Sequence, residues 1–200
     1  MPFDGWVEIA RPAAIPITEA LIGGDKELAA FWEAEKGGHR YDYVALGCSF
    51  GPVKGKPFAK AWFEVGLASA ETGEGPSAWS MDPREVIDAA ELTQSAKLGV
   101  KLELLSAEGQ TQVKRTAKEW FLRAYRVGTA QPYWEFRSTV QSPIAGAFRH
   151  HLVVRSPVGS TVEGRITLRA IVEKRTFLIF RKEQSLDEPA SVMFTLPPRG

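Results

Sequence analysis

The chain lacks most of the features that anchor or crosslink secreted and membrane proteins. It has one cysteine, Cys48, and no asparagine, which excludes an internal disulfide, a multi-cysteine zinc site and N-glycosylation. No apolar run approaches the roughly 20 residues that a membrane helix needs. The first residues show neither the basic nor the apolar region of a signal peptide. We therefore expect a cytoplasmic protein.

Histidine is also scarce, which limits the possible metal chemistry. The three histidines are His39, His150 and His151, and adjacent residues of a strand point to opposite faces. His150 and His151 are therefore not expected to bind one ion together. We expect no metal, no cofactor and no catalytic residue, and an enzyme is the less favoured class.

One short motif favours an enzyme. Residues 47–51 match G-x-S-x-G, in which Ser49 would be a nucleophile on a turn from a strand into a helix. Pro52 follows directly, and no helical pattern begins there. The motif is thus incomplete, but a hydrolase that uses Ser49 is kept as an alternative function. A small-ligand β-barrel belongs to the same alternative.

The chain has the length and composition of one soluble domain, since 44% of its 200 residues are hydrophobic and 24% are charged. Its apolar residues alternate over many short segments, such as Val44, Leu46, Cys48 and Phe50, or Leu98, Val100, Leu102 and Leu104. Many short strands at about ten-residue spacing are typical of sandwiches and barrels. We expect a mainly β (α+β) fold, an antiparallel sandwich or open barrel built from hairpins, with one or two short helices packed on it.

The expected elements follow from periodicity, caps and breakers. They are an irregular arm over 1–24, a helix over 25–37 with Asp25 as its N-cap, a β-hairpin over 40–69, a short helix over 82–94 capped by Asp82, an antiparallel meander over 96–182, and a tail over 183–200 with an edge strand.

Charge is distributed unevenly along the chain. Residues 1–100 carry nine Lys+Arg and fifteen Asp+Glu, for −6, while residues 101–200 carry sixteen and nine, for +7. From Lys114 to Lys182 there are fourteen basic residues, ten of them arginine, against four acids. Such asymmetry indicates an interaction surface.

Strand alternation predicts that many of these arginines share one sheet face. The expected binding residues on this face are Arg123, Tyr125, Tyr133, Arg137, Arg149, His151, Arg155, Arg165 and Arg169. Arginine offers a planar fork of donors suited to carboxylate or phosphate. The nearest acidic candidate is the chain's own helix near residues 26–36. Trp62 shares its strand face with Lys60 and Glu64, so it is either covered by a helix or exposed for binding.

These observations favour a non-catalytic binding module whose basic sheet face contacts an acidic protein or another anionic partner. The expected partner is an acidic protein surface or a second copy of the chain, and nucleic acid has less support. A second alternative is a membrane-acting, pore-forming-like β protein, because amphipathic strands can present leucine and valine to lipid.

Overall fold

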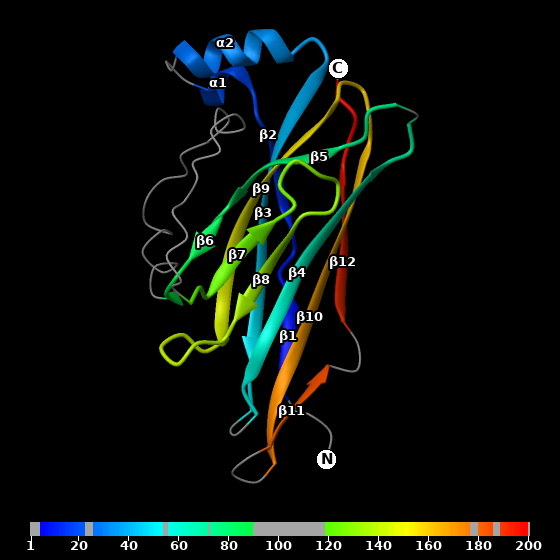
Figure 1. The fold of residues 1–200 in the computed structure, drawn as a ribbon. Coiled ribbons are helices and arrows are strands. Elements are labelled where there is room, and N and C mark those ends of the chain that lie inside the picture. Colours follow the sequence, from blue (N-terminus) through cyan, green and yellow to red (C-terminus); the bar gives the residue numbers. More distant parts are fainter. Residues whose placement is uncertain are drawn as a thin grey trace.

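Two antiparallel sheets pack face to face in the computed structural model, which describes residues 5–22, 26–53, 56–71, 73–89, 119–176, 180–185 and 189–199 (Figure 1). This arrangement confirms the expected antiparallel β-sandwich. Within the described part of the chain, no helix is long and apolar enough to cross a membrane.

The first sheet is five-stranded and is centred on the long strand β3 (His39–Gly51). The chain's N-terminal strands β1 (Trp6–Ile9) and β2 (Ala13–Pro16) both pair with β3 on one side. On its other side β3 pairs with β9 (Gly146–Pro157), which in turn pairs with β5 (Ser77–Asp82). The region expected to be an irregular arm therefore supplies two strands.

The second sheet is seven-stranded, and its long strand β10 (Val162–Thr176) carries three neighbours. These are β11 (Phe180–Ser185), β12 (Ala190–Leu196) and β4 (Phe58–Ser69). Beyond β4 follow β8 (Tyr133–Arg137), β7 (Leu122–Tyr125) and the short β6 (Glu85–Val86). The expected edge strand of the tail is β12.

The core lies between the two sheets and follows the predicted alternation. Strand β3 buries Val44 and Leu46 against residues of the other sheet such as Phe63 and Val65, and all four belong to one apolar cluster. Burying each such side chain contributes about 1.5–3 kcal/mol. Exposing these side chains to water would lose this free energy, so the apolar side of each strand faces inward.

Both helices lie at one end of the five-stranded sheet (Figure 1). They are α1 (Glu19–Ile22) and α2 (Lys26–Glu35), and α2 confirms the predicted helix. Phe31 and Trp32 of α2 pack against Tyr41 and Trp79 on the outer side of the sheet. Asp25, the expected N-cap, lies outside the described residues.

Three expectations about the elements and their connections are wrong. Residues 40–69 do not form a hairpin, because β3 and β4 belong to different sheets. The expected meander is also interrupted, since the chain leaves the seven-stranded sheet after β8, forms β9 in the other sheet and returns as β10. Alternation of apolar residues determines the buried face of a strand and leaves its neighbours undetermined.

The third error concerns the start of the helix expected over 82–94, since the described residues up to Asp88 are not helical. Asp82 is the last residue of β5, and a cis bond joins it to Pro83. The next residues form β6, whose Val86 carbonyl accepts from the amide of Phe121. Pairing with β7 thus takes precedence over the helical spacing of this segment. Residues 90–94, and the part of the expected meander over 96–118, lie outside the described residues.

A buried arginine joins the two sheets at the C-terminal tail. Arg40 of β3 donates hydrogen bonds to the hydroxyl of Ser156 and to the carbonyls of Leu196 and Pro197. Asp42, only 1% exposed, accepts from Arg199 at 3.2 Å. Burial raises the pKa of Asp42, while the nearby Arg40 and Arg199 oppose that rise. The network holds the end of β12 and the tail against β3.

Candidate functional site

The predicted binding residues lie on two opposite outer faces, so the expected single face is wrong. Arg149, His151 and Arg155 belong to β9 of the five-stranded sheet, as the register with β3 shows. The remaining predicted residues belong to the outer face of the seven-stranded sheet: Arg123, Tyr125, Tyr133, Arg137, Arg165 and Arg169. The apolar core separates the two groups.

On the five-stranded sheet, Arg155 meets the chain's own acidic helix. It donates to Glu74 at 2.6 Å and to Glu35, the last residue of α2, at 3.4 Å. His39 lies 3.1 Å from both carboxylates. The acidic helix therefore covers one of the predicted arginines, as the sequence indicated, and Arg155 is already neutralised within the fold.

The other two β9 residues lie apart from this cluster. His151 stacks on Tyr43 with ring centroids 5.3 Å apart and lies 3.4 Å from Asp82. Arg149 is exposed and has no carboxylate partner among the residues that the structure describes.

On the seven-stranded sheet, most of the predicted arginines are also paired locally. These ion pairs join Arg123 to Glu85 at 2.8 Å, Arg137 to Glu135 at 2.8 Å and Arg169 to Glu64 at 2.5 Å. The Arg123–Glu85 and Arg169–Glu64 pairs are exposed, and exposed pairs contribute about 0–1 kcal/mol each. Their main effect is to cancel the positive charge that the sequence count indicated.

A groove crosses the outer face of the seven-stranded sheet and has a volume of about 430 Å³. Strands β4 and β10 line it with Trp62, Glu64, Val65, Gly66, Arg165, Thr167 and Arg169. The turn before β8, and the start of β8, add Arg126, Gln131, Pro132 and Tyr133. Three arginines and one glutamate give the lining a formal charge of +2.

Two of the three groove arginines have no acidic partner in the described part of the chain. Neither Arg126 nor Arg165 forms an ion pair there, in contrast to Arg169, which Glu64 holds. Arg165 donates to the sulfur of Met193, a weak acceptor, at 3.3 Å. The guanidinium of Arg126 lies over the ring of Tyr133, 5.8 Å from its centroid. Uncompensated positive charge therefore concentrates in this groove.

A tight turn brings Arg126 to the groove. Arg126 has a φ of +57° and Gly128 a φ of +84°, and left-handed backbone of this kind is typical of turns. The hydroxyl of Thr129 closes the turn on the Arg126 carbonyl at 2.8 Å. The segment is then held on β4, because the amide of Val65 donates to the Pro132 carbonyl at 3.0 Å.

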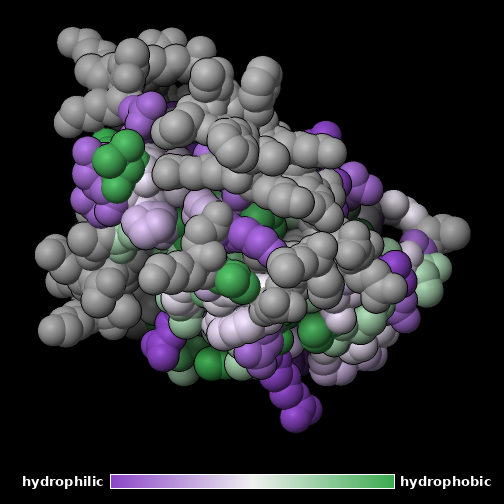
Figure 2. All heavy atoms as spheres, turned by 90° about the horizontal axis from the view of Figure 1, so that it is seen from below, coloured by the Kyte–Doolittle hydropathy of each residue, from purple (hydrophilic) through white to green (hydrophobic). Residues whose placement is uncertain are grey.

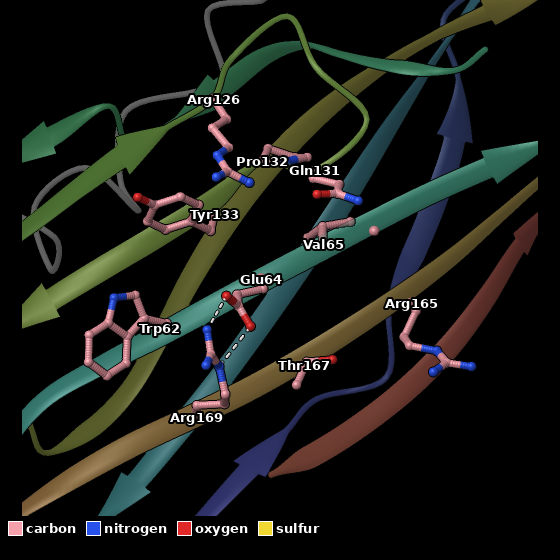
Figure 3. A pocket seen from close by; sticks show the side chains of 11 residues that line it. Trp62, Glu64, Val65, Arg126, Gln131, Pro132, Tyr133, Arg165, Thr167 and Arg169 are labelled. Atoms are coloured by element: carbon pink, nitrogen blue, oxygen red, sulfur yellow. Dashed lines mark hydrogen bonds and ion pairs between the residues drawn. The ribbon is translucent and has the colours of Figure 1, made fainter. Parts of the chain in front are cut away.

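Aromatic side chains occupy one end of the groove (Figure 3). Trp62 and Tyr133 lie on neighbouring strands there, and Tyr133 stacks on Tyr125 at 5.0 Å between ring centroids. The paired Glu64 and Arg169 lie in the middle, and Arg165 lies at the opposite end. Trp62 is partly exposed, and the guanidinium of Arg169 lies 5.7 Å from its ring centroid.

Of the predicted binding residues, Tyr133, Arg165 and Arg169 line the groove. The sequence did not predict three further residues that line it, Arg126, Gln131 and Glu64. If β7 continued beyond Tyr125, alternation would place Arg126 on the inner face. The signal for its true position was Gly128, which marks a turn.

The serine motif does not form a nucleophile elbow. Ser49 lies inside β3, paired with Glu8 and Ala147, and residues 47–51 all continue the strand. No hydrogen bond joins Ser49 to a histidine within the described ranges. The alternation that points Ser49 outward points Cys48 and His150 into the core.

Cys48 and His150 form a buried contact instead, with 3.7 Å between the sulfur and Nε2. His150 is fully buried among Phe63, Trp134 and Phe136. Burial lowers the pKa of His150 to about 3 and raises that of the Cys48 thiol. Both groups are therefore neutral near pH 7, which disfavours a thiolate nucleophile. The described residues hold no cluster of three metal-ligating side chains.

No protein-family model and no curated protein matches the sequence. Solved structures that resemble the fold include three with 7% identity each. One is described as a pore forming protein, with a TM-score of 0.41 over 96% of this chain and 89% of that one.

The other two are toxins of Clostridium perfringens. The NetB toxin in its membrane inserted form has a TM-score of 0.37 over 96% of this chain and 95% of that one. The delta-toxin has a TM-score of 0.34 over 78% and 77%. Similarity at this level assigns no function to the present chain.

We predict that His150 makes the protein less stable in mild acid. Its pKa is lower in the folded chain than the usual 6.5, so the unfolded chain binds more protons below that pH. Stability from this source is present above about pH 6.5 and is lost as pH falls toward 3. The loss between pH 7 and pH 5 amounts to about 2 kcal/mol.

Urea unfolding of wild type and of His150→Phe at both pH values measures this effect. The variant keeps an aromatic ring in the core and removes the titrating group, so its stability should change about 2 kcal/mol less than that of wild type. His151→Phe, on the outer face, is the matched control and should retain the wild-type change. Equal pH dependence of wild type and His150→Phe would contradict the assignment.

Proposed function

We propose that the protein is a binding module that holds an anionic ligand in the groove between β4, β10 and the 126–132 turn. The observation that carries this proposal is that Arg126 and Arg165, which have no acidic partner among the described residues, both line the same groove. By contrast, Arg123, Arg137 and Arg169 of the same sheet each have a carboxylate beside them.

The chemistry of the groove fits an anion better than a cation. Guanidinium groups already lie near both exposed rings, with Arg169 5.7 Å from the Trp62 ring centroid and Arg126 5.8 Å from that of Tyr133. A cationic ligand placed on either ring would meet this positive charge. An anion, in contrast, can accept charge-assisted hydrogen bonds at either end of the groove, from Arg126 or from Arg165, neither of which has an acidic partner among the described residues.

The chain offers a matched pair of variants to test this function. Arg165 and Arg149 are both outward arginines without a carboxylate partner in the described structure, but they lie on opposite sheets. Calorimetric titration with pyrophosphate should show about tenfold weaker binding for Arg165→Gln, because one charge-assisted hydrogen bond is lost. Arg149→Gln should bind as wild type does.

Salt provides an additional check, since binding should weaken as ionic strength rises. The proposal fails if wild type does not bind pyrophosphate. It also fails if Arg149→Gln weakens binding as much as Arg165→Gln does, because the effect would then reflect overall charge.

A second candidate function is action on membranes, and the connection between β6 and β7 favours it. These two strands pair with each other, with Val86 opposite Leu122, yet residues 87–121 intervene in the sequence. Within that stretch Leu98, Val100, Leu102 and Leu104 alternate with more polar residues before Gly109. Runs of about 10 alternating residues are typical of membrane-spanning β-strands.

The described surface of the protein offers little for membrane binding. Seen from below, hydrophobic residues of the described part lie in small separate groups among hydrophilic ones (Figure 2). The large exposed hydrophobic side chains come from distant segments, as Trp6, Leu21 and Val140 illustrate. Membrane action would therefore depend on the 87–121 connection.

Dye leakage from vesicles that contain an anionic lipid tests this second function. Leu102→Asp places a charge on the apolar side of the alternation, which costs about 2–4 kcal/mol at the centre of a bilayer, and should abolish leakage. Gly99→Asp adds the same charge on the polar side and should leave leakage intact. Absence of leakage with micromolar wild type, or equal leakage by both variants, would exclude membrane action through this segment.

A further inference from the structure

The groove has two chemically different ends, and strand register gives the distance between them. Trp62 lies opposite Arg169, and Gly66 lies opposite Arg165. Four residues along a strand separate the two positions, which corresponds to about 13 Å. A ligand that uses both ends must be longer than a single phosphate or a simple carboxylic acid.

The aromatic end is suited to a neutral, flat ring. Trp62 and Tyr133 lie there on paired neighbouring strands, and Tyr125 supports Tyr133 from behind by stacking at 5.0 Å. The guanidinium groups near these rings disfavour a cation and also offer flat surfaces of their own. Stacking of a nucleobase on aromatic side chains is worth about 1–3 kcal/mol per base.

The middle of the groove offers hydrogen-bond acceptors together with donors. Glu64 is held in place by two bonds from Arg169, at 2.9 and 2.5 Å, and a carboxylate retains further acceptor sites when so bound. Gln131 and Thr167 each supply a donor and an acceptor. Glu64 would repel a negative charge on the ligand, whereas it would accept hydrogen bonds from hydroxyl groups of the ligand.

At the far end, Arg165 supplies an unpaired guanidinium beside Gly66. Glycine leaves this part of the groove open, because a Cβ at position 66 would approach no atom closer than 3.9 Å. The space and the charge at this end suit a phosphate group, which arginine binds through two parallel hydrogen bonds.

Along its length the groove therefore offers groups suited first to a flat ring, then to hydroxyl groups and finally to an anion. We propose that the ligand is a nucleoside phosphate. The base stacks at Trp62 and Tyr133, the sugar hydroxyls meet Glu64 and Gln131, and the phosphate binds Arg165. This inference rests on the proposed anion-binding function. A free nucleotide and a nucleotide within a single strand share this chemistry, so both belong in the test.

Calorimetric titrations of the full chain with ADP, pyrophosphate, adenosine and a short oligothymidylate test the proposal. ADP should bind about tenfold or more tightly than pyrophosphate, because only ADP has a base to stack. Trp62→Ala should remove that advantage and leave the affinity for pyrophosphate unchanged. An oligothymidylate that binds more tightly than ADP would identify a single strand as the source, and the reverse order a free nucleotide.

A second variant fills the groove without changing its charge. Gly66→Val adds a branched side chain that strands accept well, in space that the glycine leaves open. It should weaken the binding of ADP at least tenfold, while its thermal unfolding temperature stays close to that of wild type.

The outcomes separate this inference from the function on which it depends. Equal affinity for pyrophosphate and ADP, or an unchanged ADP advantage in Trp62→Ala, would overturn the proposal that the ligand is a nucleoside phosphate. The proposed anion binding would still stand. Failure of wild type to bind either compound would overturn both.

Discussion

The burial of two apolar sheet faces against each other determines where most polar side chains of this protein lie. Strands β3, β4, β9 and β10 each present apolar residues to the shared interior. Their alternate residues must then face outward, because consecutive side chains of a strand point in opposite directions. Since β9 and β10 belong to different sheets, this one constraint divides the arginines between two surfaces that face away from each other.

Local charge pairing then decides which arginines remain available. Arg155 is neutralised by Glu35 and Glu74, and Arg169 by Glu64. Two guanidinium groups that have no acidic partner among the described residues, Arg126 and Arg165, line one groove. The excess of basic residues in the second half of the sequence is thus largely balanced within the fold, and a small site carries what is left.

Apolar periodicity in the sequence was sufficient to predict the fold class, the α2 helix and the buried face of most strands: alternation indicated the strands, and helical spacing indicated the helix. It correctly placed Arg165 and Arg169 on the outside, because each strand has a continuous apolar face. It was not sufficient to predict partners, since the sequence of β3 is equally compatible with β4 or β9 beside it. Arg126 was missed for a different reason: its left-handed backbone ends the alternation of β7, and only the neighbouring Gly128 indicates that turn. The groove also depends on segments far apart in the chain, β4, β10 and the 126–132 turn, which no local pattern brings together.

Two arginines without an acidic partner in the described structure, Arg126 and Arg165, line one groove, so an anion should bind there and not at the isolated Arg149. Nuclear magnetic resonance of the arginine Nε–H groups during addition of pyrophosphate measures this most directly. The signals of Arg126 and Arg165 should shift in a saturable way, while that of Arg149 should not. Shifts of similar size at Arg149, or a linear drift of all arginine signals without saturation, would contradict this prediction.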